Sequence, residues 1–283
     1  MAVNPKDVCL FIPPGLKRFK LNLFEGIGQK ILAAGGSVIR HDYEKVKTLP
    51  DEIIPIVGVS PQFRANFAEW KLRKRNFIYW DRGYLRRVFA TWMPTGNELG
   101  VPFGYYRWHL NCFQQQHIMT VPGDRWERLR LDRDDPSVGV RKAYPWPWQR
   151  EGKHIVVCDT LPDYWDVFAD RDWAHRTAQE LKHYTERPIV VRHKESQLPL
   201  WKEIEGAHAL VTHGSIAAVE SVCMGCPVFV DRISAAAVMG ETDFSKIETP
   251  RYPENRLEWL KSLAYHQWTE AELQNGVLWE QLT

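Results

Sequence analysis

Small, polar and acidic side chains are concentrated in one short stretch of the chain, residues 209–230. An apolar run ends at Thr212, a Gly-Ser turn follows, and the helical pattern beyond it carries Glu220. Free backbone N–H groups at a helix start bind phosphate, and a carboxylate one and a half turns later can accept hydrogen bonds from a ribose diol. We therefore predict that this stretch binds a nucleotide-type donor. The predicted donor-binding residues are Thr212, His213, Gly214, Ser215, Ile216 and Glu220.

Several of these residues also have a plain structural interpretation. Ser215 can be simply a helix N-cap, Glu220 a solvated helix residue, and His213 a structural turn residue. The combination is more specific than any member, because open α/β sheets bind ligands at the carboxyl ends of their strands. A Gly-x-Pro-Val turn and a second apolar run, residues 227–230, complete the pattern.

Arg192, His193 and Lys194 follow another apolar run, residues 188–191. Three cationic or potentially cationic side chains at a strand end suit a diphosphate leaving group, because charge-assisted hydrogen bonds stabilise its growing negative charge. These three residues would take the place of a metal ion. We predict no metal site and no cofactor besides the nucleotide sugar, UDP-linked, as co-substrate. The alternative is an ordinary solvated strand end.

The first half of the chain offers two candidates for a catalytic base. Asp81 follows an apolar run at residues 77–80, where a carboxylate could take the proton from an acceptor hydroxyl. His109 is the second candidate. An Asp next to an Arg, here Arg82, is also a common structural pair.

Cationic and aromatic residues alternate around these candidates. Cations for phosphates and aromatic faces for bases are typical of nucleic-acid binding, although Trp and Tyr also line sugar sites and ordinary cores. No known DNA-binding motif is present. The predicted acceptor-binding residues are Arg73, Arg75, Arg82, Arg86, Tyr105 and Arg107.

The 283 residues predict two domains, and charge is divided unevenly between the halves. Residues 1–150 hold 24 Lys and Arg against 14 Asp and Glu, whereas residues 151–283 hold 13 against 21. The positive first half predicts an anionic partner, or the opposite charges simply attract each other. We expect no membrane span, because no apolar run reaches about 18 residues. Without a secretory signal, a cytoplasmic location is expected.

Strand-like and helical patterns alternate in both halves, which predicts parallel sheets covered by helices. We predict an α/β fold with two Rossmann-like, doubly wound domains facing a cleft, an acceptor domain at residues 1–150 and a donor domain at 151–283. The stretch Pro-Trp-Pro-Trp at 145–148, followed by Gln-Arg-Glu-Gly at 149–152, is interpreted as their linker. The predicted strands are 8–12, 37–41, 53–59, 77–80, 154–158, 188–192, 209–212 and 227–230, and the predicted helices are 21–34, 61–71, 173–184, 198–205 and 215–224.

The stretch 209–230 resembles the donor-binding segment of glycosyltransferases of the GT-B fold. It is most similar to the capsule-type and phage-encoded branches, in which a Ser-containing turn precedes a helix with Glu and a Gly-x-Pro-Val-Phe strand. The resemblance covers residues 150–265 clearly. It covers 77–84 and 105–111 loosely, and these, with 248–253 and 255–260, are similar to uncharacterised phage proteins. The chain is short for such an enzyme and lacks extended acceptor-binding insertions.

The resemblance implies a nucleotide-sugar donor on the C-terminal domain and an acceptor on the N-terminal one. Because phages as a class glycosylate hydroxymethylated bases, it implies a modified pyrimidine in DNA as acceptor, in the host cytoplasm. A capsule-type or other cell-surface glycan, or its lipid-linked precursor, is the alternative acceptor. A sugar-nucleotide epimerase and a non-catalytic nucleotide or nucleic-acid binding protein are the alternative functions. No protein partner is predicted.

Overall fold

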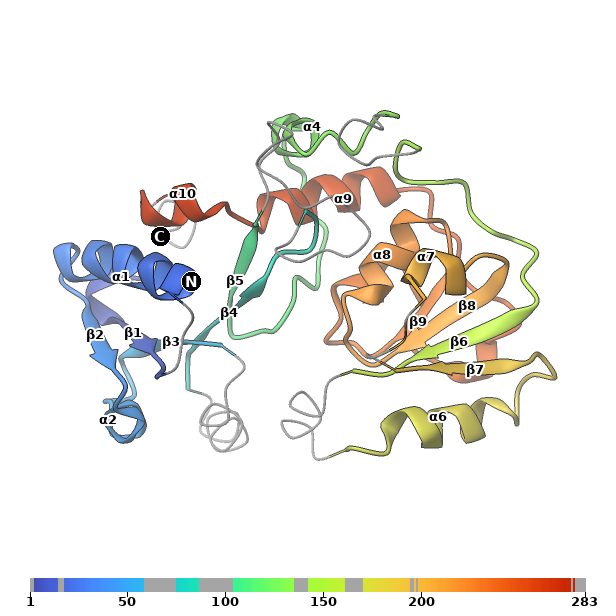
Figure 1. Ribbon diagram of the computed structural model, residues 1–283, viewed down its shortest axis with the longest axis horizontal. Helices are drawn as coiled ribbons and strands as arrows, with labels where there is room; N and C mark the ends of the chain where they lie inside the picture. Colours follow the sequence, from blue (N-terminus) through green and yellow to red (C-terminus); the bar gives the residue numbers. More distant parts are fainter. Residues whose placement is uncertain are drawn as a thin grey trace. The chain divides into compact units, whose positions relative to one another are not determined.

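The computed structural model describes residues 3–14, 18–58, 75–86, 104–134, 142–160, 170–193, 196, 198–275 and 277. The chain divides into two compact units, each with its own sheet and helices (Figure 1). The first unit comprises Met1–Gly83, Gly104–Cys112 and Gln267–Thr283, and the second comprises Tyr84–Phe103 and Phe113–His266. Among the described residues, no helix combines the length and the apolar character needed to cross a membrane.

The chain does not divide at residue 150 as predicted. Residues 113–150 belong to the second unit, and the segment from Gln267 onward returns to the first. Tyr106 and Trp268 illustrate this return, since the N–H of each donates to the carbonyl of the other at 2.8 Å. Pairing between residues so distant in sequence leaves no local signal in the composition, on which the predicted boundary rested.

The first unit contains a five-stranded sheet in the order β2-β1-β3-β4-β5. Its strands are β1 (Val8–Ile12), β2 (Ser37–Arg40), β3 (Ile54–Val57), β4 (Ile78–Arg82) and β5 (Tyr106–Leu110). Neighbouring strands from β2 to β4 are parallel, as predicted, but β5 is antiparallel to β4. The sheet is therefore mixed, and β5 was not predicted.

Helices cover the parallel part of this sheet. Helix α1 (Arg18–Ala33) contacts β1 and β2, and α2 (Tyr43–Lys47) contacts β2. Helix α10 (Glu270–Gln274) packs on α1, and a 3₁₀ turn spans Pro5–Asp7. Phe24, Ile27 and Ile31 are buried on one face of α1, which contacts β1, β2 and α10. The apolar face expected on this helix also included Leu32, which is instead exposed. The helix predicted at 61–71 lies outside the described residues.

The second unit contains a four-stranded sheet in the order β7-β6-β8-β9, and every pairing is parallel. Its strands are β6 (His154–Cys158), β7 (Ile189–Arg192), β8 (Ala207–Thr212) and β9 (Val228–Val230). All four were predicted from continuous apolar runs, which are typical of buried strands. In the structure β6, β8 and β9 are buried, whereas the edge strand β7 is only partly buried. The parallel sheet of the C-terminal half is thus confirmed.

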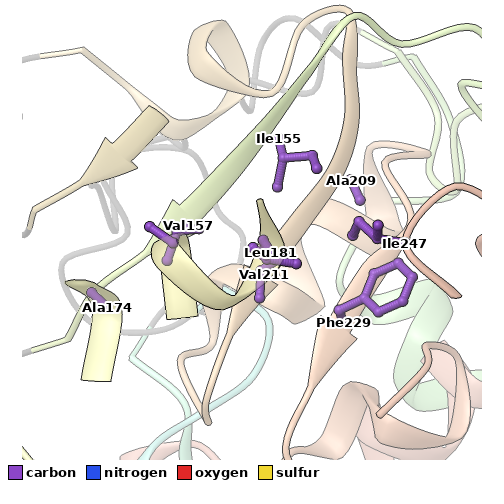
Figure 2. Packing of buried hydrophobic residues seen from close by; sticks show 9 residues of the cluster. Ile155, Val157, Ala174, Leu181, Ala209, Val211, Phe229 and Ile247 are labelled. Atoms are coloured by element: carbon purple, nitrogen blue, oxygen red, sulfur yellow. The ribbon is translucent and has the colours of Figure 1, made fainter. Parts of the chain in front are cut away.

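Helices pack on both faces of this sheet. Helix α6 (Trp173–Leu181) contacts β6 and β7, and α8 (Ala217–Cys223) contacts β8 and β9. The unit also contains α7 (Leu200–Glu203), α4 (Asp124–Arg128), which packs on α9 (Arg256–Tyr265), and 3₁₀ turns at Ala235–Val238 and Phe244–Lys246. Leu181 of α6 packs with Val157, Val211 and Phe229 in one buried cluster (Figure 2). Successive side chains of a strand point to opposite faces of the sheet. The residues of β8 and β9 that alternate with Val211 and Phe229 therefore lie on the other face, toward α8, which contacts both strands.

Residues 142–150 do not form a linker. Their backbone lies on the end of α8 inside the second unit, with Trp146 N–H donating to Cys223 O at 2.8 Å and Gln149 N–H donating to Gly225 O at 2.7 Å. The guanidinium of Arg256 lies 3.9 Å from the ring centroid of Trp148. We call residues 142–150 the strap. Its Pro and Trp residues indicated a linker only because their packing partners are distant in sequence.

Cys223 and Cys226 have the CxxC spacing but are both buried at the end of α8. Burial raises the pKa of Cys226 to about 12, and it raises the pKa of Cys223 as well. Thiols of this kind are packed small side chains and poor nucleophiles. Within the described ranges, no group of three His, Cys, Asp or Glu side chains is placed to hold a metal ion.

Candidate functional site

Polar side chains follow all four strands of the second unit at the same edge of its sheet. Asp159 follows β6, His193 follows β7, His213 follows β8 and Asp231 follows β9. Because the strands are parallel, their carboxyl ends share one edge. The strand order reverses between β6 and β8, and ligands of open α/β sheets bind at such a switch point. We define these four residues and the turn 213–216 as the strand-end site.

The ends of β6 and β8 are tied together by Thr212. Its buried hydroxyl donates to the carbonyl of Cys158 at 2.7 Å. This bond fixes the two strand ends relative to each other at the switch point. Thr212 was predicted to bind the donor, and the structure places its side chain in this structural bond.

A buried glutamine, Gln114, hydrogen-bonds to the turn after β8. Gln114 donates through Nε2 to the carbonyl of Gly214 at 2.6 Å, and its Oε1 accepts the N–H of Ala235 at 2.8 Å. Its side chain thereby joins the β8–α8 turn to the segment after β9. The conformation of the turn therefore depends on a residue far from it in sequence.

The start of α8 differs by one residue from the prediction. Ile216, not Ser215, is the N-cap, and it makes no side-chain capping bond. The hydroxyl of Ser215 instead accepts the N–H of Ala217 at 3.2 Å. Ser215 therefore satisfies one free N–H group of the helix start from the preceding position, a local bond typical of serine.

His213 is half-buried beside the ring of Trp173, with the ring centroids 5.9 Å apart. Burial lowers the pKa of His213, and the carboxylates of Asp231 and Asp170 act in the opposite direction. The N–H of Asp231 donates to the carbonyl of His213 at 3.0 Å. His213 is therefore a neutral imidazole at pH 7, with one N–H donor and one acceptor nitrogen.

Glu220 is buried rather than solvated, with 4% of its surface exposed. Every residue of α8 is buried. Burial raises the pKa of both Tyr144 and Cys223, and the Glu220 charge raises each further. Its charge therefore acts on groups packed in the protein interior. The predicted contact with a ribose stays a prediction.

Arg192, at the end of β7, is engaged within the protein. Its Nη1 donates to the carbonyl of Leu198 at 2.8 Å and forms an ion pair with Glu203 of α7. The other oxygen of Glu203 accepts the hydroxyl of Ser196 at 2.6 Å. His193 is more exposed, and its Nδ1 lies 3.5 Å from a carboxylate oxygen of Asp159. Lys194 lies outside the described residues.

Replacing Arg192 with alanine is expected to lower the free energy of unfolding by roughly 1–3 kcal/mol, because the largely buried Glu203 carboxylate would lose its cation. Urea unfolding of the purified variant measures this loss. Lys202→Ala is the matched control, since Lys202 is an exposed cation on the same helix as Glu203. Unchanged stability with a large loss of turnover would instead support the predicted contact with a diphosphate.

In the first unit, Asp81 is bonded across the β4–β5 pair. One of its oxygens accepts Nη2 of Arg107 at 2.8 Å and the hydroxyl of Tyr79 at 3.3 Å, and the other accepts the N–H of Arg82 at 2.7 Å. Arg107 is buried and Asp81 is partly exposed. This is the geometry of a structural ion pair. His109 is buried on β5 opposite Tyr79.

Most of the predicted acceptor-binding residues that the structure describes are buried. Arg75 donates to the carbonyls of Leu49, Pro50 and Ile53 at 3.0–3.2 Å. Arg86, in the second unit, donates to the carbonyl of Leu129 at 2.9 Å. Guanidinium groups held by backbone carbonyls are poor candidates for tracking phosphates. Tyr105 and Arg107 are also buried, Arg82 is exposed, and Arg73 lies outside the described residues.

Two residues of the strand-end site, Asp159 and Asp231, were not singled out from sequence, nor was Gln114, which supports its turn. Asp159 and Asp231 directly follow correctly predicted strands, so position alone could have found them. Gln114 follows no such rule, because its two partners, Gly214 and Ala235, are distant in sequence.

A scan against protein-family models and a search of curated proteins found no match to this chain. Among solved structures, the β-Kdo 2,4 transferase of Thermosulfurimonas dismutans KpsC is 12% identical, with a TM-score of 0.45 over 92% of this chain and 91% of that chain. The β-Kdo 2,7 transferase of the same protein is 11% identical, with a TM-score of 0.47 over 97% and 99%. A LacI-family transcriptional regulator from Burkholderia phymatum is 13% identical, with a TM-score of 0.21 over 91% of each chain. Because all three TM-scores are low, these similarities establish neither a shared fold nor an activity.

Proposed function

We propose that the protein is a glycosyltransferase that moves a sugar from a nucleotide-sugar donor to a hydroxyl acceptor. The observation that supports this best is the strand-end site, where histidine, serine and aspartate side chains follow four adjacent parallel strands. The turn there is part of the sequence pattern that resembles the donor segment of GT-B glycosyltransferases. The donor diphosphate would lie over residues 213–216, at the β6–β8 switch point.

His193 and His213 are the side chains best placed to hydrogen-bond the diphosphate in this proposal. Both lie at strand ends, and neither side chain is fully buried. Arg192 was expected to share this role, but Glu203 already binds its guanidinium. The proposal therefore relies on the two imidazoles and the backbone of the turn, and it includes no metal ion.

A hydroxymethylated pyrimidine in DNA is the acceptor that the positive first half favours. The burial of Arg75, Arg86 and Arg107 weakens this support, since their guanidinium groups contact protein carbonyl and carboxylate oxygens. A glycan acceptor needs fewer cations and is the alternative. Asp81 as the base would require the Asp81–Arg107 ion pair to loosen, because both of its carboxylate oxygens already accept hydrogen bonds within the protein.

The test is release of the nucleotide from UDP-, GDP- and ADP-linked sugars by the purified protein, without and then with acceptor. We expect slow hydrolysis of one donor, made faster by the correct acceptor. Hydroxymethylated duplex DNA and an oligosaccharide, offered side by side at low salt, separate the two acceptors.

Other outcomes identify the alternative functions. A changed sugar that is still attached to its nucleotide would indicate an epimerase. Binding of a nucleoside diphosphate with no turnover of any donor would indicate a non-catalytic binding protein. Absence of both nucleotide binding and donor turnover would contradict the proposal.

A further inference from the structure

A groove with a volume of about 720 Å³ opens at the other edge of the same sheet. Lys153, which precedes β6, and residues 182–188, which precede β7, contribute most of its lining. Glu248 completes it. The amino ends of parallel strands share one edge, so the groove and the strand-end site are separated by the length of β6, roughly 16 Å at about 3.3 Å per residue.

One cation of the groove lining, Arg187, is bonded on two sides within the protein. Arg187 forms an ion pair with Glu248 at 2.9 Å and donates to the carbonyl of Gly152 at 2.5 Å. The hydroxyl of Thr185 donates to the same carboxylate. These bonds hold the loop between α6 and β7 in one conformation, which lowers the entropy that ordering a ligand site would cost.

The remaining charges of the groove are predominantly positive. Lys153 and Lys182 face a single further carboxylate, Glu186, among the lining residues. Lys182 donates only to a neutral amide oxygen, that of Gln179, at 3.0 Å. These two lysines lie in the acidic half of the chain, where carboxylates outnumber cations.

An aromatic ring is exposed at the same place. Tyr184 has 42% of its surface exposed, and its ring meets that of His183 edge-on at 6.5 Å. An exposed ring beside cations and carboxylates combines an apolar face with hydrogen-bond donors and acceptors. A sugar ring that carries a carboxylate needs all three: the ring face for its C–H groups, the lysines for its charge and the carboxylates for its hydroxyls.

We propose that this groove binds an acidic oligosaccharide, at a site separate from the strand-end site. The lining favours a saccharide over a nucleic acid, because a DNA duplex carries one negative charge per about 1.7 Å of helix axis, more than Lys153 and Lys182 can offset, whereas the hydroxyls of a saccharide can donate to Glu186. The binding does not depend on the glycosyl transfer proposed above, so either can be correct without the other.

Isothermal titration of the full chain with tetragalacturonate tests the proposal, with maltotetraose and a short DNA duplex as comparison ligands. Tetragalacturonate is expected to bind, more weakly as salt rises, and maltotetraose to bind at least about tenfold more weakly. Lys153→Ala combined with Lys182→Ala is expected to weaken tetragalacturonate binding at least about tenfold. Tyr184→Ala is expected to weaken the binding of both tetragalacturonate and maltotetraose.

Lys202→Ala is the matched control, an exposed lysine of the same unit outside the groove, and it should change the affinity less than about twofold. All the substituted side chains are exposed, so melting temperatures should confirm that the variants fold. The proposal is overturned by absence of tetragalacturonate binding, by equal affinity for maltotetraose, or by binding that survives loss of both lysines. DNA that binds through the same lysines and is not displaced by tetragalacturonate would also overturn it.

Discussion

Replacing Gly225 with alanine is expected to lower the free energy of unfolding by roughly 2–5 kcal/mol. Gly225 ends α8 with a φ of +78°, and an added Cβ would lie 2.0 Å from the carbonyl oxygen of Pro147 in the strap. The left-handed conformation costs an L-residue about 1–2 kcal/mol, and overpacking adds about 1–3 kcal/mol. The obstacle is backbone, which cannot rotate away as a side chain would. Urea unfolding measures the loss.

Gly206→Ala separates the two causes. Gly206 also has a positive φ, +67°, but an added Cβ would meet nothing within 4 Å. Its substitution should therefore cost only the conformational strain, about 1–2 kcal/mol. Equal losses for the two variants would mean that the strap does not lie against the end of α8.

Replacing His213 with alanine is expected to slow sugar transfer about 100-fold, the usual cost of losing one hydrogen-bond donor to a developing charge. The expectation rests on the proposed donor site at the strand ends. His213→Gln, which keeps an N–H donor, should recover part of the rate. His175→Ala is the control, since His175 is an exposed histidine of the same unit on α6. An unchanged rate in His213→Ala would move the donor site elsewhere.

The same residue makes stability depend on pH. Burial lowers the pKa of His213 below its ordinary value of 6.5. The unfolded chain therefore binds the proton more readily, and stability is lost as pH falls below about 6.5. His213→Gln should lose less stability than the wild type between pH 7 and pH 5, as measured by urea unfolding at each pH. Some loss will remain, because burial also lowers the pKa of His266. Identical acid dependence in variant and wild type would contradict this.

The order of elements in the second unit was predictable because each of its strands is a continuous apolar run in the sequence, and three of the four are buried. Apolar runs at 154–158 and 227–230 correspond to strands in the structure, and polar residues follow each of them. In a parallel sheet, the residue after a strand lies at the ligand-binding edge whatever the rest of the fold does. The sequence therefore placed His193 and His213 at this edge, but it did not predict which residues they contact there.

Strand β5 shows where local pattern failed. Its residues include Arg107 and His109, and both are buried. A charged residue normally argues against burial. The carboxylate of Asp81 on the neighbouring strand makes this burial tolerable for Arg107, and a partner on another strand cannot be identified from the spacing of residues. The capping box of Thr269 and Glu272 at the start of α10, by contrast, was visible in the sequence and was not used.

The sequence by itself determined that the chain is α/β, that its second half contains a parallel sheet, and that polar residues follow the strands of that sheet. These follow from local periodicity, which depends on each segment alone. Only the tertiary structure decided which polar groups are used internally. Arg75, Arg86 and Arg192 look alike in the sequence as cations near strand ends or turns. Each donates hydrogen bonds to carbonyl or carboxylate oxygens that folding brings from elsewhere in the chain. Burial of a charge requires such partners, and partners at long sequence separation exist only once the chain has folded.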